Sequence, residues 1–142
     1  MIIPTKIYLA GACKNVPDEG RAWRTKATMM LNRAAEMRGT RVAAINPLDY
    51  FTYAENKQIS HKQVKNYYLN RIRNCDVVLV NLDGTNSSPG TAQETQFAVD
   101  MKIPVIGFGT SEIYHWISDV DCDVTFKDMS EAIDYIRDYF ME

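Results

Sequence analysis

The chain has 142 residues, which fits a single domain over residues 1–142, and its 46% hydrophobic and 24% charged residues are typical of a soluble globular protein. Its formal net charge of −2 argues against a nucleic-acid-binding protein, because phosphate binding calls for clustered Lys and Arg. The nearest approach to such a cluster is Arg21, Arg24, Lys26, Arg33, Arg38 and Arg41. We interpret these residues as the solvent-facing side of one helix, so no nucleic acid polymer is expected as a partner.

Cysteine and histidine usage argues against a metal site. Cys13, Cys75 and Cys122 are widely spaced and suit a reducing compartment, and the last two are expected to pack as small hydrophobic side chains. His61 and His115 share no ligand spacing with each other or with a cysteine, so no zinc site is expected. No apolar run approaches a membrane span, and the N-terminus enters a strand without a signal-like segment. We therefore expect a cytoplasmic protein with no membrane partner.

The first part of the chain alternates between strand and helix signals. A short buried strand is predicted at residues 6–12, followed by a loop that contains Pro and Asp. A helix comes next, with apolar residues at helical spacing. Asp18 is its candidate cap, and Gly39 is expected to stop it. A second strand is predicted at residues 41–45, closed by an Asn-Pro pair.

The middle of the chain combines a long loop with the next helix and strand. Residues 48–61 are aromatic and polar without a clear period, and we expect a loop with at most one helical turn, of a length that is often functional. The helix that follows has Val64, Tyr68 and Ile72 on one face. The third strand is predicted at residues 76–82.

The last part of the chain continues the alternation. A helix is predicted from residue 91 to about 101, and a fourth strand at residues 104–109. Residues 110–121 are ambiguous and fit a short helix. A short fifth strand at residues 124–126 precedes an amphipathic C-terminal helix.

This alternation predicts an α/β protein with right-handed crossovers and a five-stranded parallel sheet, covered by helices on both faces. In such sheets a ligand binds beyond the carboxyl ends of the strands, where the strand order reverses. For the order 2-1-3-4-5 that point lies between strands one and three. Residues 11–13 and 83–94 follow these strands and are therefore expected to face each other across one cleft.

The functional interpretation depends on the segment that ends at Glu94. The apolar third strand leads into a loop of Asp, Gly, Asn and Ser and then into a helix, so that backbone N–H groups point at a pocket. Glu94 is expected in the first helical turn, where the helix dipole favours its charged form, and it is a candidate nucleophile. Thr91 and Glu94 also fit a capping box, in which both side chains only tie down free N–H groups. Gly90 favours the ligand-binding alternative, because a cap does not require a glycine there.

Several standard motifs are missing from the chain. The first strand and turn lack G-x-G-x-x-G, no Walker loop occurs, and no G-x-S-x-G elbow is present. The residues favour instead a carboxylate that attacks an electrophilic carbon and forms a covalent intermediate, as in retaining glycosidases. Such a site also needs a partner that orients the nucleophile and a proton donor for the leaving group. No metal or organic cofactor is expected, because the carboxylate breaks the bond unaided.

Four segments together resemble the nucleoside 2-deoxyribosyltransferase-like family, including its deoxynucleoside 5′-monophosphate N-glycosidase branch. They are Ile7 and Tyr8 with Gly11, residues 46–49 (NPLD), residues 75–80 (CDVVLV) and residues 88–94 (SPGTAQE). The resemblance implies a three-layer flavodoxin-like (Rossmann-like) fold. It also implies cleavage of the N-glycosidic bond of a (deoxy)ribonucleoside or its 5′-monophosphate. In this family a Glu attacks the anomeric carbon, and the sugar passes to another nucleobase or to water.

Carried over residue by residue, the resemblance makes Glu94 the nucleophile and Tyr8 the residue that orients it. Ser88 stands where the nucleoside transferases have an Asp and the 5′-monophosphate branch has a Ser, and it favours a phosphorylated substrate. An ordinary helix N-cap is the alternative for Ser88. Tyr68 departs from the family, which has at this position an Asp that helps hold the sugar. The remaining substrate-binding candidates, whose two aspartates are alternatively turn residues, are Gly11, Asp49, Asp83, Gly90 and Thr91.

Two other functions stay open. A phosphoribohydrolase of the cytokinin-activating type also has Gly-Thr-x-x-Glu at a helix start, although its longer Gly-Gly run is missing here. The departure at Tyr68 keeps a nucleotide-binding module without turnover as an alternative. The resemblance further implies a homodimer or larger homo-oligomer. Aromatic residues compatible with an interface, or equally with a buried core, are Tyr114, Trp116, Tyr139 and Phe140.

Overall fold

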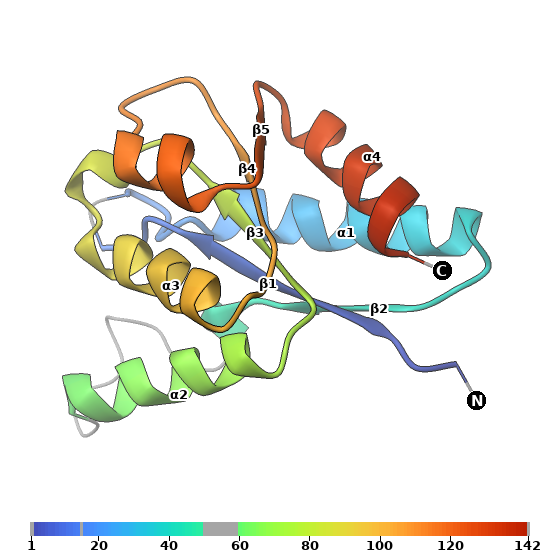
Figure 1. The fold of residues 1–142 in the computed structure, drawn as a ribbon, viewed down its shortest axis with the longest axis horizontal. Coiled ribbons are helices and arrows are strands. Elements are labelled where there is room, and N and C mark those ends of the chain that lie inside the picture. The colour runs from blue at the N-terminus through green and yellow to red at the C-terminus, as the bar shows by residue number, and fades with distance from the viewer. Residues whose placement is uncertain (1, 15, 50–59, 142) are drawn as a thin grey trace.

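The computed structural model describes residues 2–14, 16–49 and 60–141 (Figure 1). The strands in these ranges are β1 (Thr5–Gly11), β2 (Val42–Ile45), β3 (Val77–Asn81), β4 (Val105–Phe108) and β5 (Val124–Phe126). The α-helices are α1 (Arg21–Met37), α2 (His61–Arg73), α3 (Pro89–Asp100) and α4 (Met129–Phe140). The shorter helices are two 3₁₀ turns, η1 (Pro47–Asp49) and η2 (Thr85–Ser87), and a π-helix, η3 (Trp116–Asp121).

The strands form one parallel sheet in the order β2-β1-β3-β4-β5, which confirms the predicted topology. Side chains alternate between the two faces along each strand. Ile7 and Leu9 of β1 pack with α1 and α4, whereas Tyr8 and Ala10 pack with α2 and α3. Helices therefore cover both faces, giving the three layers visible in Figure 1. Because β1 lies between β2 and β3, its carboxyl end is at the reversal of strand order.

The first helix begins later than its predicted cap. The Asp18 carboxylate accepts hydrogen bonds from the backbone N–H groups of Gly20 and Ala22, at 2.9 and 3.0 Å, so it orders the turn before α1. Gly20 itself is in the left-handed conformation, with φ of 77°. Gly39, also left-handed with φ of 66°, follows the end of α1 as predicted.

The two segments without a clear sequence pattern have short helical turns. The 3₁₀ turn η1 opens the predicted loop at 48–61, of which residues 50–59 lie outside the described residues. Ser60 and Gln63 form a capping box at the start of α2. The π-helix η3 lies within the segment 110–121. Among the described residues, no helix combines the length and apolar composition that crossing a bilayer requires.

Candidate active site

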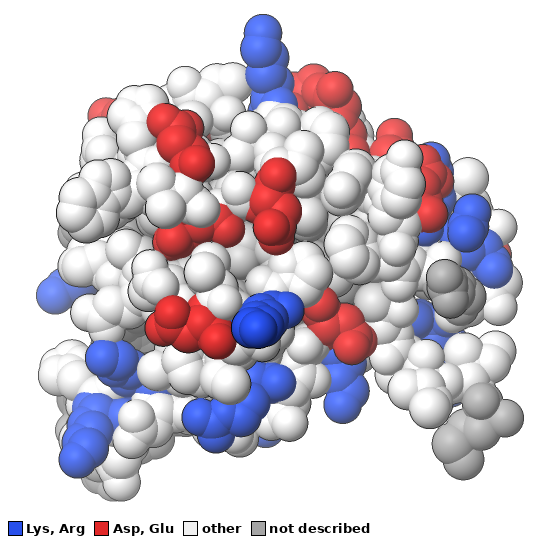
Figure 2. Space-filling view, viewed as in Figure 1, with Lys and Arg blue, Asp and Glu red and all other residues white. Residues whose placement is uncertain are grey.

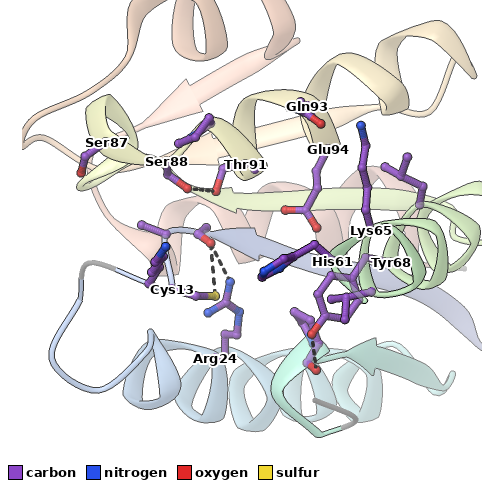
Figure 3. Close-up of a pocket in the computed structure, with 18 residues that line it drawn as sticks. Cys13, Arg24, His61, Lys65, Tyr68, Ser87, Ser88, Thr91, Gln93 and Glu94 are labelled. Carbon is purple, nitrogen blue, oxygen red and sulfur yellow. Dashed lines mark hydrogen bonds between the residues drawn. The ribbon is translucent and has the colours of Figure 1, made fainter. Parts of the chain in front are cut away.

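A cavity of about 610 Å³ opens beyond the carboxyl ends of β1 and β3. The segment after β1 and the start of α3 both line it, as predicted from the strand order, and α2 forms a further wall (Figure 3). The candidate residues that line it are Gly11, Ser88, Gly90, Thr91 and Glu94. The sequence therefore located the cleft correctly.

Tyr8 and Glu94 meet at this cavity. The Tyr8 side chain points from the middle of β1 towards α3 and is completely buried. Its hydroxyl donates a hydrogen bond of 2.5 Å to Oε2 of Glu94. The alternative interpretation of Thr91 and Glu94 as a capping box is wrong, because no side chain caps the start of α3 and the Glu94 carboxylate is bonded to Tyr8 instead.

The position of Glu94 in its helix also differs from the prediction. Because α3 begins at Pro89, Glu94 lies in the second turn, and the first turn holds no acidic residue. The helix dipole acts mainly within the first turn, so it contributes little to the carboxylate. Burial raises the pKa of Glu94 to about 7, against the opposing effects of the Tyr8 hydrogen bond and the Arg24 charge. The prediction that Glu94 is held in its charged form is therefore corrected, because its carboxyl group titrates near neutral pH.

The start of α3 carries the other predicted contacts. Ser88 lies at the N-cap position with Pro89 at N1, yet its hydroxyl caps no N–H group and instead pairs with the Thr91 hydroxyl at 2.6 Å. A Cβ added at Gly90 would meet no atom within 4 Å, so packing does not require a glycine there. A Cβ at Gly11 would lie 3.0 Å from the Trp23 ring, so helix packing explains that glycine.

The two predicted aspartates do not line the cavity. Oδ1 of Asp83 accepts hydrogen bonds from the backbone N–H groups of Thr110 and Ser111, each at 2.7 Å, which ties the loop after β3 to the loop after β4. Asp49 is exposed at the end of η1. Asp83 thus has the geometry of the alternative reading, a turn residue.

Tyr68 does line the cavity, on the face of α2 that packs towards Tyr8. Its hydroxyl donates to the carbonyl oxygen of Pro47 at 3.3 Å. An aromatic ring therefore forms the wall at the position where the resemblance implies a carboxylate.

Arg24 is a cavity residue that the sequence interpretation placed on the solvent-facing side of α1, and this is wrong. Its side chain is 1% exposed. The guanidinium donates to the carbonyl oxygens of Leu9, Gly11, Glu19 and Gly20 at 3.0 to 3.3 Å. The signal was present, because Arg24 precedes the buried Ala27 and Leu31 by three and seven residues and so shares their helix face.

Two lysines and a histidine add to the lining of the cavity. Lys14 and Lys65 line it, together with His61. The sequence of α2 contains four Lys or Arg residues and no Asp or Glu. Figure 2 shows Lys and Arg gathered over α2 at the lower left, with Asp and Glu above them. In the described part of the chain, no three His, Cys, Asp or Glu side chains are placed to hold a metal ion.

Comparison with known proteins shows the family and the fold of the chain. The family model described as nucleoside 2-deoxyribosyltransferase matches residues 7–132. No curated protein sequence matches the chain. A solved 2-deoxyribosyltransferase from Bacillus psychrosaccharolyticus is 21% identical, with a TM-score of 0.68, and the alignment covers 95% of this chain and 92% of that one.

Two further solved structures share the fold. A 2-deoxyribosyltransferase from Leishmania mexicana is 22% identical, with a TM-score of 0.64 and coverage of 96% of this chain and 99% of that one. The CMP N-glycosidase BcmB from Clostridium botulinum is 16% identical, with a TM-score of 0.53 and coverage of 95% and 100%. These structures agree with the predicted flavodoxin-like fold, and the family model spans most of the sequence. The chain therefore belongs to the nucleoside 2-deoxyribosyltransferase family.

Proposed function

We propose that this protein cleaves the N-glycosidic bond of (deoxy)ribonucleosides or their 5′-monophosphates and passes the sugar to another nucleobase or to water. The observation that carries the proposal is the Glu94 carboxylate, which lines the cavity while hydrogen-bonded to the buried Tyr8 hydroxyl. Family membership supports the reaction class. The names of the similar structures include both 2-deoxyribosyltransferases and a CMP N-glycosidase, so both acceptors occur among proteins of this fold.

In the proposed mechanism, a carboxylate oxygen of Glu94 attacks the anomeric carbon of the sugar. The C–N bond breaks, its electron pair leaves with the base, and the base takes up a proton from water. A second base or a water molecule then attacks the same carbon, gives up a proton to the solvent and releases the carboxylate, so two inversions retain the configuration. The Tyr8 hydrogen bond restricts the rotation of the carboxylate and so orients it before the attack.

The cavity wall favours a 5′-monophosphate over an unphosphorylated nucleoside. The Ser88 and Thr91 hydroxyls form a neutral hydrogen-bonding pair at the start of α3, where an Asp would repel a phosphate. Lys14 and Lys65 line the same cavity and supply positive charge. We propose that this end of the cavity holds the phosphate.

The decisive experiment is chromatography of nucleosides and 5′-monophosphates after incubation with the protein, with and without an acceptor base. We expect free base from wild type and none from Glu94→Gln, because an amide is a poor nucleophile. Glu131→Gln on the exposed face of α4 is the matched control. In rapidly quenched samples, the intact mass of wild type should increase by one sugar unit. Turnover by Glu94→Gln at the wild-type rate would refute the assignment.

A nucleotide-binding module without turnover is the second candidate, favoured by Tyr68 on the cavity wall. In that case a nucleotide raises the melting temperature of the protein while no free base appears on prolonged incubation. The same incubation therefore separates the two functions.

We also propose that the protein forms a homo-oligomer in the cytoplasm. Trp116 and Val120 of η3 are 71% and 72% exposed beside a groove of about 830 Å³. Tyr139 is exposed as well, whereas Tyr114 and Phe140 are half-buried. Light scattering tests the proposal, and we expect Trp116→Ser to shift the mass towards the monomer. The free thiols of all three cysteines support a reducing compartment.

A further inference from the structure

Arg24 is a buried cation with no carboxylate bound to it. Among the described residues, its guanidinium forms no ion pair; it donates to backbone carbonyl oxygens of β1 and of the loop after it, and it also interacts with the Cys13 thiol. The guanidinium also stacks over the Trp23 ring, 4.8 Å from its centroid. Burying a charge without a counter-ion costs several kcal/mol unless other interactions compensate. The carbonyl oxygens and the Trp23 ring compensate part of this cost, but no acidic side chain among the described residues neutralises the charge.

One acidic residue that lines the same cavity as Arg24 is Glu94. Figure 3 shows the Glu94 carboxylate and the Arg24 guanidinium entering the cavity from opposite sides, from α3 and α1. The positive charge of Arg24 lowers the pKa of Glu94 and so opposes the effect of burial. Its hydrogen bond to the Gly11 carbonyl also fixes the end of β1, from which the cavity-lining segment continues.

We propose that Arg24 is a positioning residue of the reaction, whose fixed charge favours the ionised form of Glu94 that attacks the sugar. The inference rests on the proposed function, because it takes Glu94 as the nucleophile. We assign Arg24 no contact with the substrate, because its guanidinium already donates its hydrogen bonds to backbone carbonyl oxygens. It acts through Glu94 and through the backbone at the end of β1.

Other charged and titratable groups also face Glu94, but none is fixed in the same way. They are Tyr8 on β1, Cys13 and Lys14 after β1, and His61, Lys65 and Tyr68 on α2. Tyr8 and Cys13 stay neutral near pH 7, because burial raises the pKa of both groups. Lys14 and Lys65 are exposed, so dissolved salt screens their charges, whereas a buried charge is screened much less. Among these charges, that of Arg24 is therefore expected to act on Glu94 with the least dependence on salt.

The experiment compares Arg24→Gln and Arg24→Lys with wild type and with Arg33→Gln, which removes an exposed charge from the same helix. We expect Arg24→Gln to move the acidic limb of the pH–rate profile to higher pH by about one unit. At pH values below that limb, the rate of the variant should therefore be about tenfold lower than that of wild type. Arg24→Lys keeps the charge and should restore most of the shift. Arg33→Gln should leave the profile unchanged. A loss of rate that is equal at every pH would make Arg24 merely structural and overturn the inference.

A second measurement needs no substrate. The Glu94 side-chain carboxyl is titrated by NMR in wild type and in the variants, and its midpoint should rise in Arg24→Gln. If Arg24→Gln does not fold, the titration midpoint of Glu94 is instead measured in wild type at about 50 and about 500 mM salt. A buried cation predicts almost no change of this midpoint between the two salt concentrations. A strong salt dependence, or an unchanged midpoint in a folded Arg24→Gln, overturns the inference. Absence of turnover by wild type refutes the proposed function alone, while this titration still reports on Arg24.

Discussion

Replacing Glu94 by Gln should stabilise the folded protein at alkaline pH while it removes activity. Burial raises the pKa of Glu94 from its ordinary value of 4.5 to about 7. Between these values the folded protein holds a proton that the unfolded chain has already released, so the free energy of unfolding falls as pH rises. Above about pH 7 the folded state carries the full cost of the buried charge. Gln has nearly the same shape and cannot ionise, so it removes that cost.

The magnitude follows from the size of the shift. One pKa unit corresponds to about 1.4 kcal/mol, so the change from 4.5 to about 7 amounts to about 3 kcal/mol. Partial exposure of the residue and the need to hydrogen-bond the new amide reduce this figure, and we expect about 1–3 kcal/mol. Urea unfolding at about pH 4 and about pH 8 measures it. Glu94→Gln should match wild type at the lower pH and exceed it at the higher.

The control is Glu131→Gln, which removes an exposed carboxylate and should change stability by less than about 0.5 kcal/mol at either pH. The reasoning fails if Glu94→Gln gains no stability between the two pH values, since burial would then not have raised the pKa of Glu94. If Glu94→Gln loses activity and gains stability, the Glu94 carboxyl is kept for function at a cost to the stability of the fold.

Three further substitutions test separate contacts. Tyr8→Phe removes a hydrogen bond to a charged acceptor, worth about 1.5–3 kcal/mol, so the pKa of Glu94 and the acidic limb of the pH–rate profile should rise by about one to two units; an unmoved limb contradicts this. Ser88→Asp should raise KM for 5′-monophosphates at least about tenfold relative to nucleosides, and equal effects on both would exclude a phosphate at this position. Asp83→Ala should lower the free energy of unfolding by about 1–2 kcal/mol with kcat nearly unchanged, whereas a large loss of kcat would restore Asp83 to the site.

The topology was readable from the sequence because each element carries a strong local pattern. The apolar runs of β1 and β3 are too short for helices, and each is followed by a segment with glycine, so the strands and the cleft between them could be predicted. The contact between Tyr8 and Glu94 came from the family resemblance, since no local pattern joins two residues so far apart.

The errors share a physical cause, which is that burial depends on the assembled fold. Arg24 was interpreted by its charge, although its spacing to Ala27 placed it on the apolar face. The start of α3 was predicted at Thr91 because a capping box is a local signal, whereas the helix begins at Pro89. The ionisation of Glu94 was inferred from that wrong helix start, and only the surrounding layers reveal how far burial raises its pKa.

The sequence distance between Tyr8 and Glu94 has a consequence for the chain before it is complete. The two residues are 86 positions apart and meet only when β1 has been enclosed by the later strands. No fragment that ends before α3 can contain both members of the pair, so a growing polypeptide lacks the proposed glycosyl-accepting centre until α3 has been synthesised. If the chain were divided between these residues, the two fragments would regain turnover only when they associate. Turnover would then report that association.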